Sequence, residues 1–416
     1  MPPFARLTDL VGVTSYSSSS SSSTLTPSNK SISKPLWVPS GARGVFGGQV
    51  IAQSLAASSR TIKPPFGLNS MHCYFLLPAF SQPDIEYRVE ILRNGKSYSN
   101  RLVRAFQGER EVFVLLASYT LPPMDIPVLP VPSPRDPSHH PSSTSTNQEE
   151  KNIKVFHTLR FALKQTDNTS SNVSRGKSKF TPSGVQAVYQ TPFPDNLVPW
   201  EQCLLEEHRW QKFYDEKCKN WKGARKTYLE EYIRERTESP VGIAMARFSD
   251  YDKSKSEENE QGSQYVRMTW LNARLNESEK PDIETAKAMI AYMTDFQFIG
   301  TASRSVGLHQ SSNPRIGMLA SLDHTIHFYP IPPDFDISTE PILHVMESQS
   351  VNVSSGRGVV QGRVYTQKGI LIAVTSQEGV VRADLRGLEA KGLIEGGITV
   401  EDDEGNEKKR RREAKL

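Results

Sequence analysis

The length, composition and charge of the chain set the first limits. With 416 residues it is long enough for two domains that each bury a core. Only 37% of its residues are hydrophobic and 28 are prolines, which predicts that part of the chain is disordered. The net charge of +4 is too small to indicate nucleic-acid binding, although it suits an anionic small substrate. No apolar run approaches the ~18 residues of a membrane span, and we find no secretory signal.

Cysteine and glycine patterns predict neither a metal site nor a bound cofactor. Cys73, Cys203 and Cys218 have no metal-binding or disulfide spacing, which suggests a reducing compartment. The glycines between Gly44 and Gly48 do not follow a strand as a phosphate loop does, so they favour close helix packing.

The chain begins with an arm and a first folded unit. Residues 1–35 include an unbroken serine run at 17–23, which predicts a flexible arm, with order starting near Trp37. The first unit is expected at 36–122, with a helix rich in small residues at 50–57. Four strands should follow, with a hairpin turn at Asn94-Gly95. They are expected at 70–77, 85–92, 97–106 and 112–121.

A polar segment separates the first unit from the second. Residues 123–195 begin rich in Pro, Ser and Thr and are otherwise polar, which indicates a linker or insertion. Residues 196–236 are charged and helix-favouring, and their aromatic residues favour a helical connection anchored on the protein's own surface.

The second unit is expected at 237–388, and it contains an unusual helix. Asp282 can cap the start of this helix and Gly300 can end it. Apolar residues lie on all its sides, which is typical of a buried helix, yet Asp295 lies within it. A desolvated carboxylate must be hydrogen-bonded, paired or catalytic, and satisfaction by backbone N–H groups alone remains open at this point. Strands are expected at 241–247, 265–271, 318–329, 342–353, 357–366 and 370–377.

The two units read as repeats. The spacing of His72 to Pro78 is matched by His324 to Pro330, and Arg101 falls on Arg357. One antiparallel sheet wrapped round one long helix, made twice in one chain, resembles a double hotdog fold, an α+β architecture.

The repeats differ where chemistry is possible. The second unit offers a carboxylate, a hydroxyl and an amide at Asp295, Ser321 and Gln377. Such a trio can hold a water, with the carboxylate as general base and the other two groups fixing its direction. That chemistry suits hydrolysis of an activated acyl group such as a thioester, with a helix-start N–H stabilising the oxyanion. The aligned residues of the first unit are Ala56, Asn69 and Tyr119.

Several motifs in order resemble the acyl-CoA thioesterase II family. The resemblance implies hydrolysis of fatty acyl-CoA without a cofactor, with Asp295, Ser321 and Gln377 binding the attacking water. Family members often have Thr where this chain has Ser321, and the hydroxyl is kept. The motifs are Arg43 to Gln49, His72 to Pro78, Leu92 to Ser97, Asp295-Phe296, Leu322-Asp323-His324 and Ser376 to Gly379.

The charged tail at 389–416 suggests where in the cell the protein is located. Ala414-Lys415-Leu416 resembles the peroxisomal signal that an import receptor reads, and the family resemblance strengthens that interpretation. Lys408 to Arg412 leaves a nuclear signal or a merely solvated tail as alternatives. We also expect a homo-oligomer.

The sequence also offers candidate substrate contacts, and it leaves alternative functions open. Gly47, Gly48, Arg101 and Arg357 are candidate substrate contacts, although an exposed sheet arginine is an equal alternative. His72 and His324 are expected to bond between sheet and helix. His324 and His327 should face opposite sides of a strand and share no ion. A hotdog hydratase or dehydratase and a non-catalytic binding protein are the alternative functions.

Overall fold

The structure is a computed structural model, and it describes residues 6–15, 29–122, 191–247 and 265–385, except 219, 277, 311 and 353. Residues 123–190 of the insertion predicted at 123–195, and the whole tail predicted at 389–416, lie outside these residues. Within the described ranges, no helix is long and apolar enough to cross a membrane.

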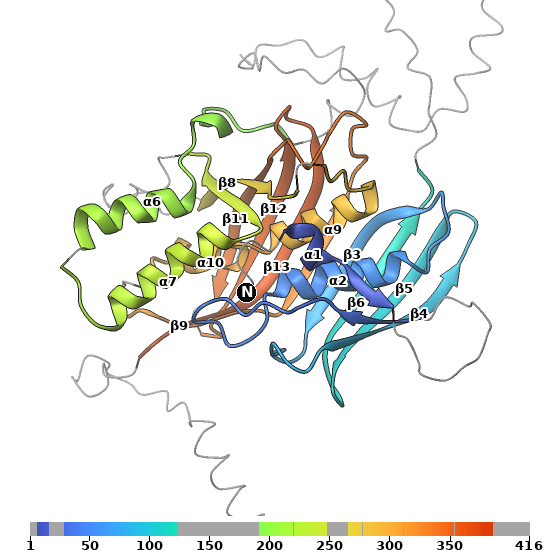
Figure 1. The fold of residues 1–416 in the computed structure, drawn as a ribbon, viewed down its shortest axis with the longest axis horizontal. Coiled ribbons are helices and arrows are strands. Elements are labelled where there is room, and N and C mark those ends of the chain that lie inside the picture. The colour runs from blue at the N-terminus through green and yellow to red at the C-terminus, as the bar shows by residue number, and fades with distance from the viewer. Residues whose placement is uncertain are drawn as a thin grey trace, which may run out of the picture. The chain divides into compact units, whose positions relative to one another are not determined.

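The first unit is one helix followed by four strands (Figure 1), as predicted. Buried Val50, Ile51 and Leu55 of the helix belong to the core beneath the sheet. The turn at Asn94-Gly95 joins two strands whose register pairs Asn94 with Ser99. These elements are α2 (Gly47–Ser59), β3 (Gly67–Phe75), β4 (Ile85–Asn94), β5 (Tyr98–Gln107) and β6 (Arg110–Thr120).

The second unit repeats this plan with three extra strands and a second short helix. The predicted strand at 318–329 is split at Leu322, so it forms two strands that both pair with the last one. The elements are β7 (Val241–Met245), β8 (Val266–Ala273), α9 (Ile283–Thr294), α10 (Phe298–Ser305), β9 (Ile316–Ser321), β10 (Asp323–Phe328), β11 (Ile342–Asn352), β12 (Arg357–Thr366) and β13 (Leu371–Ala383).

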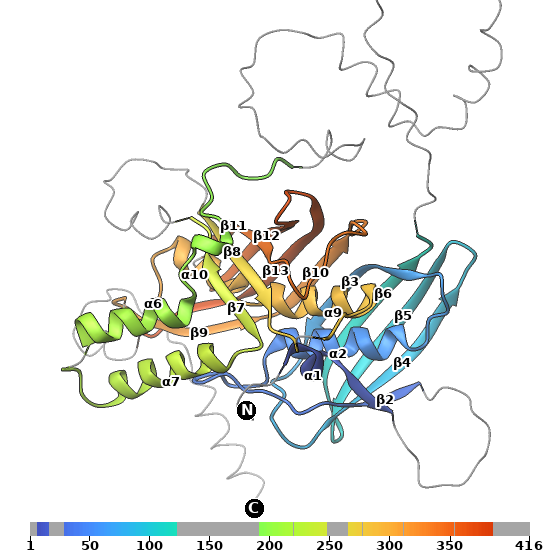
Figure 2. The same cartoon turned by 45° about the horizontal axis from the view of Figure 1, so that its top comes forward.

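The two sheets join edge to edge through β3 and β10, which pair antiparallel. The main path of the resulting 13-stranded sheet runs β1-β2-β4-β5-β6-β3-β10-β13-β12-β11-β8-β7. Helices α2 and α9 pack against each other in a shared hydrophobic core (Figure 2). This is the double hotdog fold that the repeats predicted. Joining the sheets in this way removes one exposed edge from each unit.

The connection before the second unit is helical, as expected. Its aromatic residues pack on one another, with the rings of Trp210 and Tyr232 centred 6.0 Å apart. Residue Glu206 at the start of α6 is buried against the second unit. The elements are η1 (Trp200–Gln202), α6 (Glu206–Phe213), η2 (Tyr214–Cys218) and α7 (Ala224–Glu238).

The prediction of a flexible arm at 1–35 is wrong for its described parts. Residues Leu7–Val11 form α1, and Leu7 and Leu10 are 0% and 4% exposed. The carbonyl oxygen of Leu10 accepts a hydrogen bond from Gln53 Nε2 at 2.8 Å. The short apolar run of α1 buries itself against α2 and α9, which composition alone did not reveal. Two short strands, β1 (Val13–Ser15) and β2 (Lys30–Ser33), extend the sheet beyond β4.

Helix α9 starts as predicted but ends earlier than predicted. The Asp282 carboxylate accepts from the N–H groups of Glu284 and Thr285. The helix ends at Thr294, however, and Gly300 lies inside α10 rather than ending α9. The left-handed residue between the two helices is Gln297, with φ 61°. Asp295 is therefore the C-cap of α9 rather than a mid-helix residue, which lets its side chain reach beyond the helix.

The strand register corrects the predicted repeat alignment. Met71 of β3 stands opposite Ile326 of β10, and both are fully buried. Met71 also pairs with Ala117, and Ile326 pairs with Thr375, which occupy matching places in the last strands. The pseudo-twofold axis therefore passes through the pair formed by Met71 and Ile326.

Counting from this axis changes the partner of each histidine. Two residues before Ile326 is His324, whereas His72 follows Met71 by one residue, so the two histidines are not counterparts. Burial agrees, because His324 is buried whereas His72 is exposed. Successive residues of a strand face opposite sides, so an alignment wrong by an odd number exchanges the two faces. The register of β3 with β6 shifts by one residue between Leu68 and Ser70, so Leu68 and not Asn69 lies opposite Tyr119.

Candidate active site

Asp295 lies where the end of α9 meets the start of α2. Its Oδ2 atom accepts a hydrogen bond from the backbone N–H of Gly48, with 2.7 Å between the heavy atoms. The first turn of a helix presents unpaired N–H groups and a partial positive charge, so a carboxylate is stabilised there. Glycine is required at this junction because a Cβ on Gly48 would lie 2.5 Å from the carbonyl oxygen of Tyr292.

Gln377 of β13 holds the other oxygen of the same carboxylate. Its Nε2 atom donates to Asp295 Oδ1 at 2.7 Å. The Gln377 side chain is 0% exposed and lies behind Asp295, outside the lining of the cleft. Burial raises the pKa of Asp295 above its ordinary value, while the bonds from Gln377 and Gly48 oppose part of that shift. The result is an oriented carboxylate that binds a proton more readily than an exposed aspartate.

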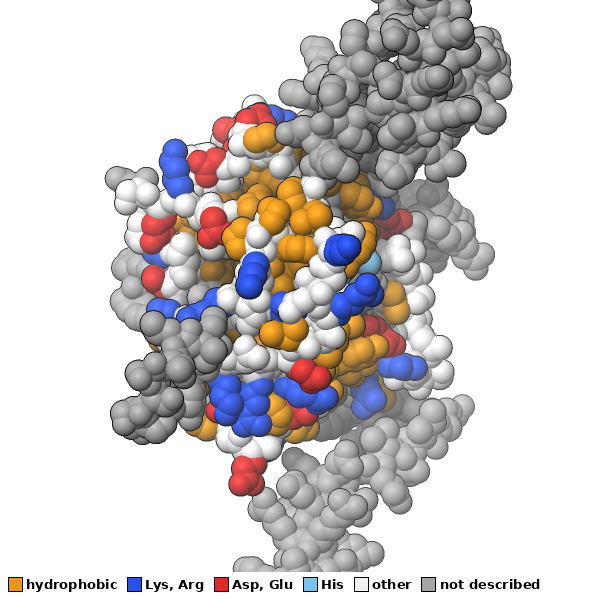
Figure 3. Space-filling view, turned by 90° about the vertical axis from the view of Figure 1, so that its right-hand side faces the viewer, with side chains coloured by type: hydrophobic (Ala, Val, Ile, Leu, Met, Phe, Trp, Pro, Cys, Tyr) orange, Lys and Arg blue, Asp and Glu red, His pale blue; other side chains and the backbone are white. Residues whose placement is uncertain are grey.

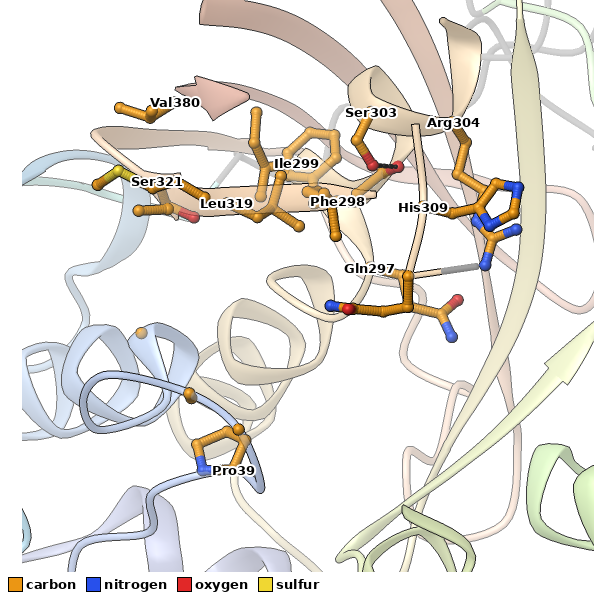
Figure 4. A pocket seen from close by; sticks show the side chains of 18 of the residues that line it. Pro39, Gln297, Phe298, Ile299, Ser303, Arg304, His309, Leu319, Ser321 and Val380 are labelled. Atoms are coloured by element: carbon orange, nitrogen blue, oxygen red, sulfur yellow. Dashed lines mark hydrogen bonds between the residues drawn. The ribbon is translucent and has the colours of Figure 1, made fainter. Parts of the chain in front are cut away.

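Ser321 lies on the same cleft as Asp295. It is the last residue of β9, and it pairs with Gly379, two residues beyond Gln377. Figure 4 shows its side chain facing the cavity beside Leu319. Of the predicted trio, the structure thus joins Asp295 to Gln377 by a direct bond and sets Ser321 on the wall that Asp295 also lines.

The cleft is large, with a volume of about 2510 Å³. Its walls come from the start of α2, the end of β3, helices α6, α7 and α10, and strand β9. Arg209, Arg267 and Arg304 give one side a basic character. Such a lining favours an anionic ligand.

A polar network ties the helical connection to the loop that follows Asp295. The buried carboxylate of Glu206 on α6 accepts from Gln297 Nε2 at 2.9 Å and from the Tyr232 hydroxyl at 3.1 Å. It also lies 3.4 Å from an Arg209 nitrogen. The left-handed residue Gln297 is two positions from Asp295, so this network helps to fix the end of α9.

The four predicted substrate contacts divide into two groups. Gly47 lines the cleft, and a Cβ there would lie 2.9 Å from Asp295 Oδ2. Arg101, in contrast, is 2% exposed and donates five hydrogen bonds to neighbouring groups of its own unit, so it has no donor left for a ligand. Arg357 is exposed and pairs with Glu378 at 3.2 Å, which fits the alternative of a surface sheet arginine.

The histidines lie partly as expected. His324 is buried and His327 is exposed, so they face opposite sides of β10 as predicted. The expectation that His72 bonds between sheet and helix is wrong, because it is exposed and contacts Thr325 of the neighbouring strand. His324 does turn inward, and its Nδ1 lies 3.0 Å from Gln377 Nε2.

Sequence reasoning missed three contacts of the site. They are the bonds from Gly48 to Asp295, from Gln377 to His324 and from Gln297 to Glu206. Each joins residues from different elements, and no spacing rule links them. The only available signal was a pair of glycines at the start of α2, where two helices approach closely.

The fold and the site define the class: a double hotdog protein whose second unit carries a carboxylate and an amide beside a wide cleft. The family description "Acyl-CoA thioesterase N-terminal domain" matches residues 34–120, and "Acyl-CoA thioesterase C-terminal domain" matches residues 207–381. Together these matches cover more than half of the chain. The chain belongs to the acyl-CoA thioesterase II family.

Relatives extend over nearly the whole chain. "Acyl-CoA thioesterase 2" of Haemophilus influenzae is 29% identical over 344 residues, which cover 82% of this chain and 89% of that protein. "Peroxisomal acyl-coenzyme A thioester hydrolase 1" of Saccharomyces cerevisiae is 25% identical, over 85% of this chain and 90% of that protein. The crystal structure of the acyl-CoA thioesterase II TesB2 from Mycobacterium marinum aligns with a TM-score of 0.52 and 18% identity. That alignment covers 91% of this chain and 98% of that one, and it supports the fold.

Proposed function

We propose that this enzyme hydrolyses fatty acyl-CoA to a free fatty acid and CoA, with Asp295 as the general base. As a member of its family, the chain is an acyl-CoA thioester hydrolase. The assignment of Asp295 as the base rests on one observation. Its carboxylate lines the cleft, and each of its two oxygens accepts a hydrogen bond with 2.7 Å between the heavy atoms. A base held in this way has one orientation, and its raised pKa favours proton uptake from water.

The proposed reaction needs no side-chain nucleophile. A water between the acyl carbon and Asp295 gives up its proton to the carboxylate as its oxygen attacks the thioester carbonyl. The Ser321 hydroxyl, on the same cleft wall, directs this water, and the Gln377 amide fixes the carboxylate that receives the proton. Direct contact of Gln377 with the water stays a prediction.

An N–H group for the oxyanion is available at the start of α2. Gly47 is the first residue of that helix, and it lines the cleft beside Asp295. The N–H of Gly48 is already taken by the carboxylate, which leaves that of Gly47 as our candidate. An oriented donor of this kind typically contributes about 3 kcal/mol to the transition state.

The test is a thiol-release assay on the purified full chain with short, medium, long and branched acyl-CoA. Asp295→Asn should abolish turnover without unfolding the protein. Gln377→Ala should lower kcat and, because it removes a bond that lowers the Asp295 pKa, should also move the rising limb of the pH profile upward. Near-normal turnover of the Asp295→Asn variant would remove Asp295 as the base.

The hydratase alternative loses support from the histidine that contacts Gln377. Such chemistry needs an acid–base group that titrates near neutral pH and reaches the substrate. His324 is fully buried, and burial lowers its pKa to about 3. Absence of thiol release, with water added across an enoyl-CoA instead, would reverse this conclusion and favour the hydratase.

For the location we propose the peroxisome. The name of the yeast relative supports the expectation drawn from Ala414-Lys415-Leu416, with the import receptor as partner. An amino-terminal fluorescent tag should give punctate signal that becomes diffuse when Leu416 is removed. Nuclear signal in both forms would favour the basic run from Lys408 to Arg412 instead.

The predicted homo-oligomer remains a prediction. Figure 3, seen from the side of the first unit, shows hydrophobic side chains gathered near the middle of that face. Tyr74 and Leu116 are among the exposed apolar residues of the first sheet, at 58% and 42%. Measuring the mass of the protein in solution would test it.

A further inference from the structure

A buried histidine stands behind the residue that holds the proposed base. His324 of β10 is 0% exposed and lies outside the lining of the cleft, so it does not meet the substrate in this structure. Its Nδ1 lies 3.0 Å from Gln377 Nε2, the same nitrogen that donates to Asp295 Oδ1 at 2.7 Å. The proposed water-activating chemistry does not use this histidine.

The chemistry of the three groups fixes the direction of both bonds. An ionised carboxylate only accepts hydrogen bonds, so the amide atom that faces Asp295 must be the nitrogen. An NH₂ group has two hydrogens, and with one directed at Asp295 the other is available for His324. His324 Nδ1 must then be the acceptor, which places the ring proton on Nε2.

Both neighbours of Gln377 thus select the same amide orientation. Rotating the amide by 180° would set Oε1 against the Asp295 carboxylate and against His324 Nδ1, and all three would be acceptors. Neutrality of His324 is required for this arrangement, and the desolvation that lowers its pKa to about 3 keeps it neutral.

We propose that His324 is a positioning residue for thioester hydrolysis, because it accepts the second hydrogen of the Gln377 amide and so holds the first on Asp295. The inference rests on the proposed role of Asp295. Loss of His324 frees the amide to rotate, which leaves the carboxylate less well oriented toward the water. We expect kcat to fall and KM to stay near its parent value, since His324 lies outside the lining of the cleft.

The fold supplies a matched control in His344 of β11. It is also 0% exposed, and burial also lowers its pKa to about 3. The ring of Phe298 contacts both histidines, with centroids 5.4 Å from His324 and 5.0 Å from His344. His344, however, bonds to Thr375 Oγ1 at 3.2 Å rather than to Gln377. Replacing either histidine with leucine therefore removes a fully buried polar ring that contacts Phe298, but only the change at His324 releases the amide.

The experiment compares His324→Leu and His344→Leu in the full-length chain by thiol release. We expect both variants to lose thermal stability, while His324→Leu alone lowers kcat by about tenfold with KM within about twofold. A tenfold change corresponds to about 1.4 kcal/mol, the size of one good hydrogen bond. In a Gln377→Ala background, the same His324→Leu change should have no further effect on kcat.

Two polar variants decide the matter if the leucine variant does not fold. Asparagine can place its side-chain oxygen near the position of Nδ1, whereas the longer glutamine places its polar atoms near Nε2. His324→Asn should therefore keep kcat within about threefold of the parent, and His324→Gln should lose about tenfold. Equal kcat in these two variants would overturn the proposal.

The remaining outcomes separate the two claims. If Asp295→Asn retains turnover, the proposed function itself fails. If Asp295→Asn is inactive but His324→Leu and His344→Leu have equal kcat, the base stands and the positioning role fails. A tenfold loss that persists in the Gln377→Ala background would also overturn it, since His324 would then act by a route other than the amide.

Discussion

Gln377 and Tyr119 occupy corresponding places in the two sheets, and each reaches the end of the helix of its own unit. Gln377 donates to Asp295 at the end of α9, whereas the Tyr119 hydroxyl donates to Ser58 Oγ at 2.8 Å, near the end of α2. It also lies 3.2 Å from Ser59 Oγ. Counted from the helix starts, Ser59 rather than Ala56 is the counterpart of Asp295. The first unit keeps the contact but has no carboxylate in it.

This correspondence predicts that loss of the contact in the first unit lowers stability but not turnover, whereas loss of the contact in the second unit lowers turnover. Tyr119→Phe should lower the free energy of unfolding by about 1 kcal/mol, because it leaves buried serine hydroxyls without their partner. Turnover should not change, because the contact holds no reacting group. Chemical denaturation and thiol release measure the two quantities on the same sample. A variant that loses activity while keeping its stability would show that the first unit takes part in catalysis.

Gly48→Ala should destabilise the protein by about 1–3 kcal/mol. The new Cβ would lie 2.5 Å from the Tyr292 carbonyl oxygen, so α2 and α9 must move apart. Gly300→Ala is the matched control, since its Cβ would meet no atom within 4 Å and the residue lies in α10. There alanine should leave stability unchanged or raise it by up to about 1 kcal/mol, from its higher helix propensity. The midpoints of urea unfolding compare the two, and equal midpoints would contradict the close approach of the helices.

Much of the fold was predictable because its signals are local. The turn at Asn94-Gly95 and the cap at Asp282 depend only on neighbouring residues, and both formed where expected. The end of α9 was not predictable, because a glycine was available at position 300 while the chain turns at Gln297 instead. There the bond from Gln297 to Glu206, 91 residues away in the sequence, supports a conformation that glutamine rarely adopts.

The sequence suggested candidate residues for the site but not their arrangement. A carboxylate among apolar residues, and its absence from the other repeat, singled out Asp295 before any geometry was known. That Gln377 lies behind Asp295 and not on the cleft depends on the register of β13, which sequence does not give. The histidine alignment was wrong for the same reason, since strand pairing decides which side of β3 or β10 a residue faces.

Arg101→Met should destabilise the protein without altering the binding of substrate. The guanidinium is buried and donates five hydrogen bonds to Thr61 and to residues of β4 and β5. Its loss leaves several acceptors without a donor, at a cost of about 2–4 kcal/mol. Arg357→Met is the control, because that arginine is half exposed and its ion pair contributes little. Both variants should keep KM within about twofold. A KM that rises tenfold in the Arg101 variant alone would restore it as a substrate contact.

Asp295→Asn should show a stability difference from the parent that depends on pH. The folded-state pKa of Asp295 lies above the unfolded value of about 3.9, so the folded protein holds this proton more tightly than the unfolded chain. The stability that the group contributes is thus complete below about pH 3.9 and is lost as the pH rises through the raised pKa. Asparagine has no such loss, although its single side-chain oxygen can accept from only one of the two donors, Gly48 and Gln377, at every pH. The unfolding free energy of the variant minus that of the parent should therefore increase as the pH rises above about 4 and level off once the pH exceeds the raised pKa. Thermal unfolding across this pH range measures the difference. A difference that stays flat or falls would mean that burial does not raise the pKa of Asp295, which would remove the physical reason for its activity as a base.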